Sequence, residues 1–216
     1  MRRVLDLSMP LESGMRGVSI TPAMTLESDG WNASTLSLYS HCGTHMDAPC
    51  HFETGATGVD KLPLDACVGS TIVVDLTPVD LSEEISVERF KAAAPAQDWD
   101  GARVLLRTDW SLRIGTPDYR DRLPRISLDL ANWFVENKVA LIGVEPPSIA
   151  NVHDLDEVAR IHQVLLNAGV VIIEGLTGLD RLPAEQFTLV ALPLPISGGD
   201  GSPARVIAIV GADESS

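Results

Sequence analysis

Three histidines and an aspartate lie close together in the segment HCGTHMDAPCHF. They are His41, His45, Asp47 and His51, and every spacing between them is even. Side chains alternate between the two faces of an extended chain, so we expect all four to project from one face of a strand. The intervening side chains would then face the core: Cys42, Met46, Ala48, Cys50 and Phe52. The spacing therefore predicts a strand with one ligand-rich face.

These residue types are the ones that bind divalent metal ions. Neutral imidazole and carboxylate suit zinc and manganese, and a catalytic site uses about three protein ligands with a position left for water. The chain holds only five histidines, so three on one segment favour a shared role. We expect His153 to be a surface residue. Cys42 and Cys50 would point to the opposite face, which disfavours a cysteine nucleophile.

The pattern His41-x-Gly43-Thr44-His45-x-Asp47-x-Pro49-x-His51-Phe52 resembles the signature of the metal-dependent cyclase-like hydrolase family. The resemblance continues at residues 5–8, 104–108, 162–174 and 191–205, which covers almost the whole chain. It implies an α/β fold, a single mixed-sheet domain of the swivelling β/β/α type spanning residues 1–216. It also implies a homodimer or larger homo-oligomer.

The resemblance implies a two-metal site. His41, His45 and Asp47 match the ligands of the first ion, with Asp47 bridging to the second, while His162 matches a ligand of the second ion and Glu174 touches both. His51 matches the residue that accepts and donates a proton. The expected cofactor is two zinc ions per subunit, with manganese as the alternative and the number of ions open. The local sequence pattern is consistent with the two distant ligands, because His162 falls in an expected helix and Glu174 ends an expected strand.

The activity that the resemblance implies is hydrolysis of a small-molecule amide C–N bond by a hydroxide held at the metal centre. The best-named candidate is arylformamidase, the reaction of tryptophan catabolism that converts N-formylkynurenine to kynurenine and formate. The alternatives are a lactam, cyclic imide or lactone hydrolase, a non-hydrolytic metal-dependent cyclase, and a non-catalytic metal-binding protein. Formamidase-type members carry an aromatic residue and Pro-Gly in the N-terminal loop, where this chain has Met15-Arg16-Gly17. Roles for Arg16, Glu145 and residues 198–203 stay open.

The composition of the chain limits the classes of partner that it can bind. The chain has 216 residues, and 16 Lys and Arg against 30 Asp and Glu give a formal charge of −14. Such an acidic chain lacks the basic excess that binds nucleic acid or an anionic membrane surface. No apolar run approaches the roughly 20 residues of a membrane span, and Asp6 interrupts a signal-peptide core. Three cysteines without a CxxC pair indicate reduced thiols, and we expect a cytoplasmic protein that acts on a small molecule.

The elements that must position these residues follow from apolar runs and capping residues. We expect strands at residues 4–7, 36–40, 71–76, 104–108, 139–144, 170–174, 188–192 and 205–210. Most of these runs are continuously apolar, which predicts strands covered on both faces. Helices are expected at 87–94, 128–137 and 155–167, behind Ser86, Ser127 and Asp154 as N-caps. Residues 139–174 then form a βαβ crossover with parallel strands, and residues 10–33 are expected to be a loop.

Overall fold

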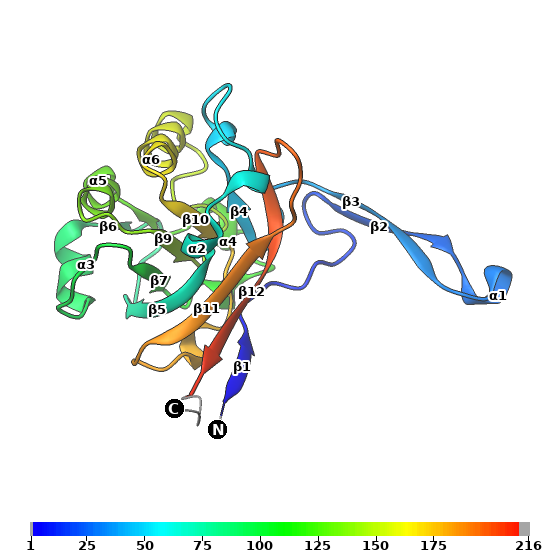
Figure 1. Ribbon diagram of the computed structural model, residues 1–216, viewed down its shortest axis with the longest axis horizontal. Coiled ribbons are helices and arrows are strands. Elements are labelled where there is room, and N and C mark those ends of the chain that lie inside the picture. The colour runs from blue at the N-terminus through cyan, green and yellow to red at the C-terminus, as the bar shows by residue number, and fades with distance from the viewer. Residues whose placement is uncertain (1, 212–216) are drawn as a thin grey trace.

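The computed structural model describes residues 2–211, and its main sheet has eight strands in the order β1-β12-β11-β5-β7-β9-β10-β4 (Figure 1). The long strand β12 pairs with β11 on one side and with β4 on the other, so the sheet closes into a barrel with β1 outside the ring. The strands are β1 (Arg3–Asp6), β4 (His45–Asp47), β5 (Val68–Asp75), β7 (Arg103–Arg107), β9 (Leu141–Val144), β10 (Val171–Glu174), β11 (Phe187–Pro193) and β12 (Gly201–Val210). Closure leaves few unpaired strand edges.

The strands β5, β7, β9 and β10 are parallel neighbours. Val171 pairs with Leu141 in the register of β9 and β10, and the helix α6 (Leu155–Asn167) connects the two strands. This confirms the predicted crossover. All the residues of β9 and β10 are buried, as the continuous apolar runs predict for strands covered on both faces.

Three helices cover the outer face of the parallel strands (Figure 1). They are α3 (Val87–Ala93), α5 (Leu128–Glu136) and α6, and each begins behind its predicted cap. Ser86, Ser127 and Asp154 accept hydrogen bonds from backbone N–H groups of the first turns. The other helices are short: α1 (Leu26–Asp29), α2 (Leu64–Cys67), α4 (Asp118–Asp121), and the 3₁₀ turns Pro49–His51, Val59–Lys61, Trp110–Arg113 and Leu179–Arg181.

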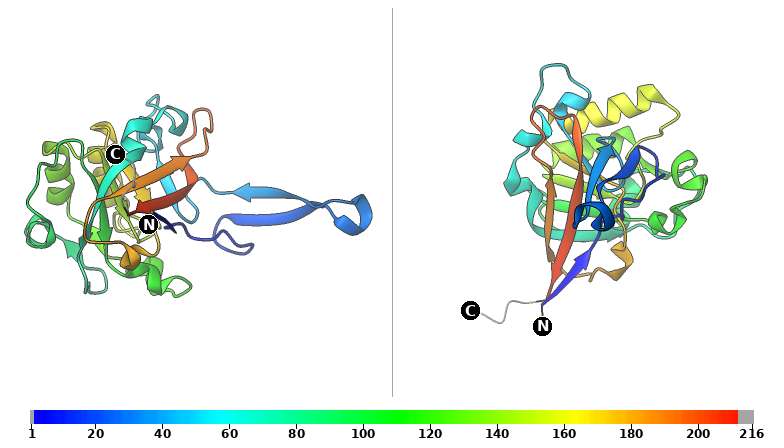
Figure 2. Two further views of the ribbon diagram at one scale, coloured as in Figure 1. Left: turned by 60° about the horizontal axis from the view of Figure 1, so that its bottom comes forward. Right: turned by 90° about the vertical axis from the view of Figure 1, so that its right-hand side faces the viewer.

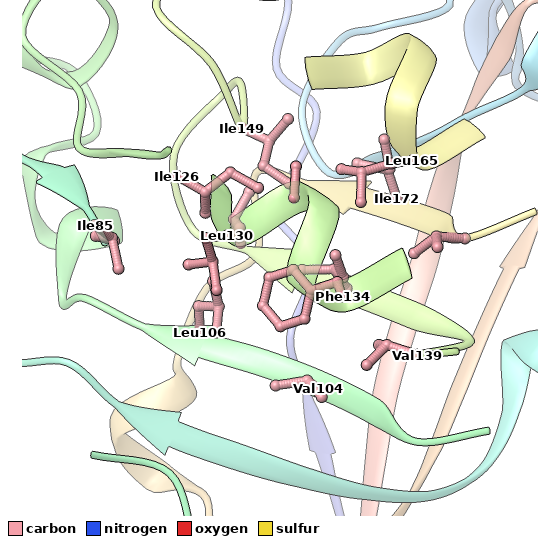
Figure 3. Packing of buried hydrophobic residues seen from close by; sticks show 14 of the residues in the cluster. Ile85, Val104, Leu106, Ile126, Leu130, Phe134, Val139, Ile149, Leu165 and Ile172 are labelled. Carbon is pink, nitrogen blue, oxygen red and sulfur yellow. The ribbon is translucent and has the colours of Figure 1, made fainter. Parts of the chain in front are cut away.

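Alternate residues of the parallel strands enter two different cores. Val104, Leu106 and Ile172 pack under the helices with residues such as Phe134 and Leu165 (Figure 3). Leu105 and Ile173 instead face the barrel interior, where they join residues such as Met46, Leu189 and Ala208. Because side chains alternate along a strand, Glu174 lies on the same face as Ile172 and thus on the helix side of the sheet. The barrel interior is an apolar core, and the Glu174 carboxylate lies outside it.

A two-stranded hairpin extends away from the body of the molecule (Figures 1 and 2). Strands β2 (Val18–Met24) and β3 (Ala33–Leu38) pair antiparallel, and α1 connects them at the tip. The prediction of a loop over residues 10–33 is therefore wrong for 18–24, for the helix at 26–29 and for residue 33, where β3 begins. Strand β3 also begins before the predicted residue 36 and is mostly exposed, unlike the core strands. The remaining strands, β6 (Glu84–Ile85) and β8 (Arg125–Ile126), form a small parallel pair beside the helices.

The segment from His41 to His51 is not one extended strand, which corrects the prediction made from its even spacings. A turn carries His41, only His45–Asp47 is a strand, and Pro49–His51 forms a 3₁₀ turn. Gly43 makes the first turn possible with a φ of +60°, a conformation that glycine adopts without strain. Pro49 starts the 3₁₀ turn because its fixed φ suits a first helical position. Among residues 2–211, none of the helices has the length and apolar character needed to span a bilayer.

Candidate metal centre

Strand β4 brings three of the predicted ligands together. It lies between β10 and β12, and His45 is the register partner of Glu174. Directly opposed residues of an antiparallel pair have their side chains on the same face, so His45 meets Glu174. The Nε2 atom of His45 lies 3.2 Å from Oε2 of Glu174 and 3.7 Å from Oδ1 of Asp47. Met46, between His45 and Asp47, points into the apolar barrel. The predicted alternation of faces therefore holds within β4.

His41 reaches the same point from the turn before β4. Its Nδ1 atom lies 2.9 Å from Oδ1 of Asp47. Thr44 fixes the turn, because its hydroxyl donates to the carbonyl of Gly175 and accepts the backbone N–H of Met9. The imidazole needs the glycine at position 201, where a Cβ atom would lie 2.7 Å from Cε1 of His41.

His162 approaches from α6, on the helix side of the sheet. Its Nε2 atom lies 3.2 Å from Oε1 of Glu174 and 3.5 Å from Oδ2 of Asp47. Its Nδ1 atom donates to the carbonyl of Val158, and Nδ1 of His45 donates likewise to the carbonyl of Gly43. These backbone bonds select the tautomer that leaves each Nε2 lone pair facing the carboxylates.

The donor set suits divalent cations. His41, His45 and Asp47 form one group of ligand atoms within 4.8 Å of one another, and Asp47, His162 and Glu174 form a second. Asp47 belongs to both groups, which is the arrangement expected for two neighbouring ions. His45, Asp47, His162 and Glu174 are all buried. Buried imidazole and carboxylate groups at this spacing match the ligand preferences of zinc and manganese.

The electrostatics of the cluster favour bound positive charge. Burial acts to raise the pKa of Glu174, but hydrogen bonds from His162 and His45 hold it far below its ordinary value. Burial acts to lower the pKa values of His45 and His162, but their bonds to Glu174 raise both. Burial also opposes the charge on His41, yet the hydrogen bond with Asp47 raises its pKa to about 9. The carboxylates thus attract cations, either protons on the imidazoles or a divalent metal ion.

His51 lies at the edge of this cluster. It ends the 3₁₀ turn, its side chain is 26% exposed, and its ring stacks on that of His41 with the centroids 4.0 Å apart. Burial lowers the pKa of His51, and the charge of His41 lowers it further. No hydrogen bond within residues 2–211 occupies the His51 side chain, although Nδ1 lies 3.7 Å from Oδ2 of Asp200. The imidazole is therefore available to accept and release a proton.

A cavity of about 630 Å³ opens above the cluster. Its floor includes the five predicted ligands and His51, and its walls come from the N-terminal segment, residues 114–120, residues 147–152 and α6. Met15, Ile114, Pro147 and Val158 make much of the wall apolar. Arg16 also lines the cavity. The volume is that of a site for a small molecule.

Two acidic residues make contacts that their local sequence does not predict. Asp200, just before β12, lies 3.0 Å from Nε2 of His41. Glu145, just after β9, is buried and accepts hydrogen bonds from the segment that begins at Thr108. The run Gly198-Gly199-Asp200-Gly201 signals a turn, but its pairing partner β4 lies about 150 residues earlier in the sequence. His153 is 53% exposed and pairs with Asp121, as expected for a surface residue.

Comparison with known proteins agrees with this fold and site. The family model described as putative cyclase matches residues 5–151. The chain is 33% identical over 181 residues to kynurenine formamidase of Bacillus thuringiensis subsp. konkukian, covering 84% of this chain and 81% of that protein. It is 35% identical over 184 residues to kynurenine formamidase of Salinibacter ruber, covering 82% and 79%.

Solved structures show the same architecture. Isatin hydrolase A from Labrenzia aggregata, bound to benzyl benzoate, superposes with a TM-score of 0.84 at 27% identity, covering 98% of this chain and 94% of that chain. A predicted metal-dependent hydrolase from Bacillus stearothermophilus gives a TM-score of 0.80 at 26% identity, with 97% and 98% covered. The predicted mixed α/β fold and the family resemblance of the His41–Phe52 motif are both confirmed, and the chain belongs to the putative cyclase family.

Proposed function

We propose that this chain is a metal-dependent hydrolase that cleaves a small-molecule amide C–N bond, with N-formylkynurenine as the best-named substrate. The observation that carries the proposal is the cluster of three imidazoles and two carboxylates, four of them buried, at the floor of a small-molecule cavity. The similarity to kynurenine formamidases over more than four-fifths of the chain supports the same reaction class.

The ligand roles follow from the two groups of donor atoms. His41, His45 and Asp47 would hold one ion, and Asp47, His162 and Glu174 would hold a second. Zinc fits three nitrogen and two oxygen donors, and manganese is the alternative. A divalent cation bound here supplies a water activated for attack at neutral pH and polarises the substrate carbonyl.

The chain's own residues move the proton and shape the pocket. His51 accepts a proton from the attacking water and passes it to the leaving nitrogen through Nε2, since Nδ1 faces Asp200. The apolar wall packs against the body of the substrate and limits the entry of bulk water. Tyr119 also lines the cavity and is fixed, because its hydroxyl donates to the carbonyl of Glu145.

We further propose a homodimer. The β2–β3 hairpin forms an arm that extends from the body (Figure 2), and this arm exposes several large apolar side chains. Met24, Leu26, Trp31 and Leu36 are between 40% and 65% exposed. Apolar side chains concentrated on an extended arm are typical of a surface that packs on another subunit. A cytoplasmic location is consistent with Cys42, Cys50 and Cys67, which are all unpaired thiols.

The test combines metal analysis with product analysis. The purified protein should contain one or two divalent ions per chain and release formate from N-formylkynurenine. Chelation should abolish turnover, and added zinc or manganese should restore it. Rates of hydrolysis of a lactone, a cyclic imide and an aliphatic amide give the substrate selectivity. Full turnover by metal-free protein, or bound metal with no hydrolysis of any substrate, would contradict the proposal.

A further inference from the structure

We propose that Asp200 is a positioning residue that fixes His41 as a metal ligand and orients His51 beside it. Asp200 lies between β11 and β12, outside the histidine motif. Its Oδ2 atom lies 3.0 Å from Nε2 of His41 and 3.7 Å from Nδ1 of His51. The inference rests on the proposed function, because it assigns Asp200 a part in that same site.

The contact with His41 decides which ring nitrogen is available to a metal ion. When Nε2 carries the hydrogen that is donated to Asp200, Nδ1 keeps its lone pair, and Nδ1 lies 2.9 Å from Oδ1 of Asp47. A histidine ligand normally donates its second ring N–H to a carboxylate or a carbonyl, which sets the tautomer and the basicity. His45 and His162 use backbone carbonyls for this purpose. Asp200 completes the same pattern for His41.

Asp200 also lies within ion-pair distance of His51, at 3.7 Å. The His41 and His51 imidazoles are stacked with an interplanar angle of 27°. The Oδ2 atom of Asp200 lies beside the edges of both rings, and the hydroxyl of Ser40 donates to it at 3.2 Å. One carboxylate oxygen therefore links a proposed metal ligand to the proposed proton-transfer residue.

The backbone holds Asp200 in register with the motif. The N–H of Ala48 donates to the carbonyl of Asp200 at 3.0 Å, and Gly201 pairs with Asp47. The N–H of Val59 donates to the carbonyl of Gly199 at 2.8 Å. These bonds attach the Asp200 segment to the chain on both sides of His51. The carboxylate position is thus fixed relative to both imidazoles.

A ligand role for Asp200 is the alternative that the experiment must separate. His41, His51 and Asp200 also have donor atoms within 4.8 Å of one another. The Asp200 side chain is 48% exposed, however, whereas that of Asp47 is 1% exposed. An exposed ion pair contributes little to folding stability, so Asp200→Asn should fold normally.

The experiment compares Asp200→Asn with Asp200→Glu and with the control Asp60→Asn. Asp60 lies against the same segment, where it accepts the N–H of Gly198, and its substitution removes the same charge without touching either imidazole. Zinc affinity is measured by competition with a chromogenic chelator, zinc content at saturation by elemental analysis, and kcat and KM with N-formylkynurenine. We expect Asp200→Asn to keep the full zinc content and nearly the same KM. Its zinc affinity and its kcat should each fall about 10–100-fold.

Asp200→Glu should recover part of both losses, and Asp60→Asn should behave as the wild type. Unchanged affinity and kcat in Asp200→Asn would overturn the inference. Loss of one zinc equivalent at saturation would also overturn it, because Asp200 would then be a ligand. A wild-type chain that binds zinc without cleaving amides would overturn the proposed function alone, since the affinity comparison still tests Asp200. A wild-type chain that binds no zinc would overturn both.

Discussion

At the residue scale, His51 differs from the other imidazoles near the centre in what surrounds it. His45 and His162 are buried against Glu174, which raises their pKa values despite burial. His51 has only the exposed carboxylate of Asp200 nearby, at 3.7 Å. Burial and the charge of His41 outweigh that carboxylate, so the pKa of His51 is lowered. An imidazole with a lowered pKa releases its proton more readily and is suited to proton transfer, whereas imidazoles with raised pKa values are suited to holding charge.

Replacing His51 with alanine should separate proton transfer from metal binding. We expect kcat to fall about 10²–10⁴-fold, which is the range for loss of a general acid–base group. Metal content and thermal stability should stay close to wild type, because His51 belongs to neither group of proposed ligands. Steady-state kinetics and elemental analysis check this. His162→Ala is the matched comparison, and it should lose metal as well as activity. A metal-depleted His51→Ala protein would contradict the assignment.

The pH dependence of kcat/KM follows from the same surroundings. His51 must be neutral to accept a proton, and its pKa lies below the ordinary value of 6.5. A bound divalent cation would lower that pKa further, since like charges repel. We therefore expect activity to be retained at pH 6.5 and to decline only at lower pH. The measurement is a pH profile of kcat/KM for the wild type and His51→Gln. An acid limb that persists unchanged in His51→Gln would count against the role, and a limb above pH 6.5 that depends on His51 would contradict the lowered pKa.

At the element scale, a single carboxylate holds the segment that leads to one wall of the cavity. Glu145 follows β9, and its Oε2 atom accepts the backbone N–H groups of Thr108 and Trp110 and the hydroxyl of Thr108. Its Oε1 atom accepts the hydroxyl of Ser111. Burial raises the pKa of Glu145, and the bonds from Thr108 and Ser111 act against that rise. Residues 114–120, which line the cavity, continue from this anchored segment.

Removal of the Glu145 side chain should destabilise the fold. Glu145→Ala leaves several buried donors without an acceptor, each at a cost of about 1–3 kcal/mol, so we expect a loss on the order of 3 kcal/mol. Glu145→Gln keeps one acceptor oxygen and should lose less. Urea denaturation gives the free energy of unfolding, with Glu136→Ala on the exposed face of α5 as the control. Equal stability of Glu145→Ala and Glu136→Ala would show that the segment does not depend on this carboxylate.

The elements that the sequence predicts are those whose signals are local. Continuous apolar runs and capping serines mark the strands and helices around the crossover, and the structure confirms them. The strand at 18–24 has no such signal, because Pro22 and polar residues interrupt it and its hydrogen bonds depend on β3. In the motif, even spacing is compatible with a short strand between two turns, and Gly43 and Pro49 are the residues that indicate those turns.

Asp200 and Glu145 could not be located from the sequence for a different reason. Asp200 reaches the histidines only because β12 pairs with β4, and Glu145 meets Thr108 only because β9 lies beside β7. Such pairings bring together residues far apart in the chain, and neither segment alone indicates its partner. His162 and Glu174 are just as distant from the motif, and they were predicted only because the family resemblance supplied their positions.

At the scale of the whole molecule, the metal centre is largely shielded from solvent, whereas the arm formed by the β2–β3 hairpin is exposed. Four of the five proposed ligands, His45, Asp47, His162 and Glu174, are buried. The β2–β3 hairpin extends away from the body (Figures 1 and 2) and buries few of its own side chains. Exposure of the arm's apolar side chains to water is unfavourable for the monomer unless another surface covers them. Association of two chains through the arms would remove that cost.

Substitutions at the tip of the arm should therefore weaken association without unfolding the chain. Leu26 is 65% exposed and Trp31 is 56% exposed, so neither belongs to a core of the chain. Burial of each such side chain in an interface contributes about 1.5–3 kcal/mol. The Leu26→Asp/Trp31→Asp variant should then raise the dimer dissociation constant by at least roughly 100-fold.

Size-exclusion chromatography with light scattering over a range of concentrations measures this change. Leu64→Asp is the matched control, because Leu64 is 63% exposed and begins a short helix on the body, as Leu26 does on the arm. The control should remain dimeric, and both proteins should unfold at similar urea concentrations, since the arm contributes little to either core. If the double variant is as dimeric as the control, subunits associate through another surface, and the exposed apolar residues of the arm need a different partner.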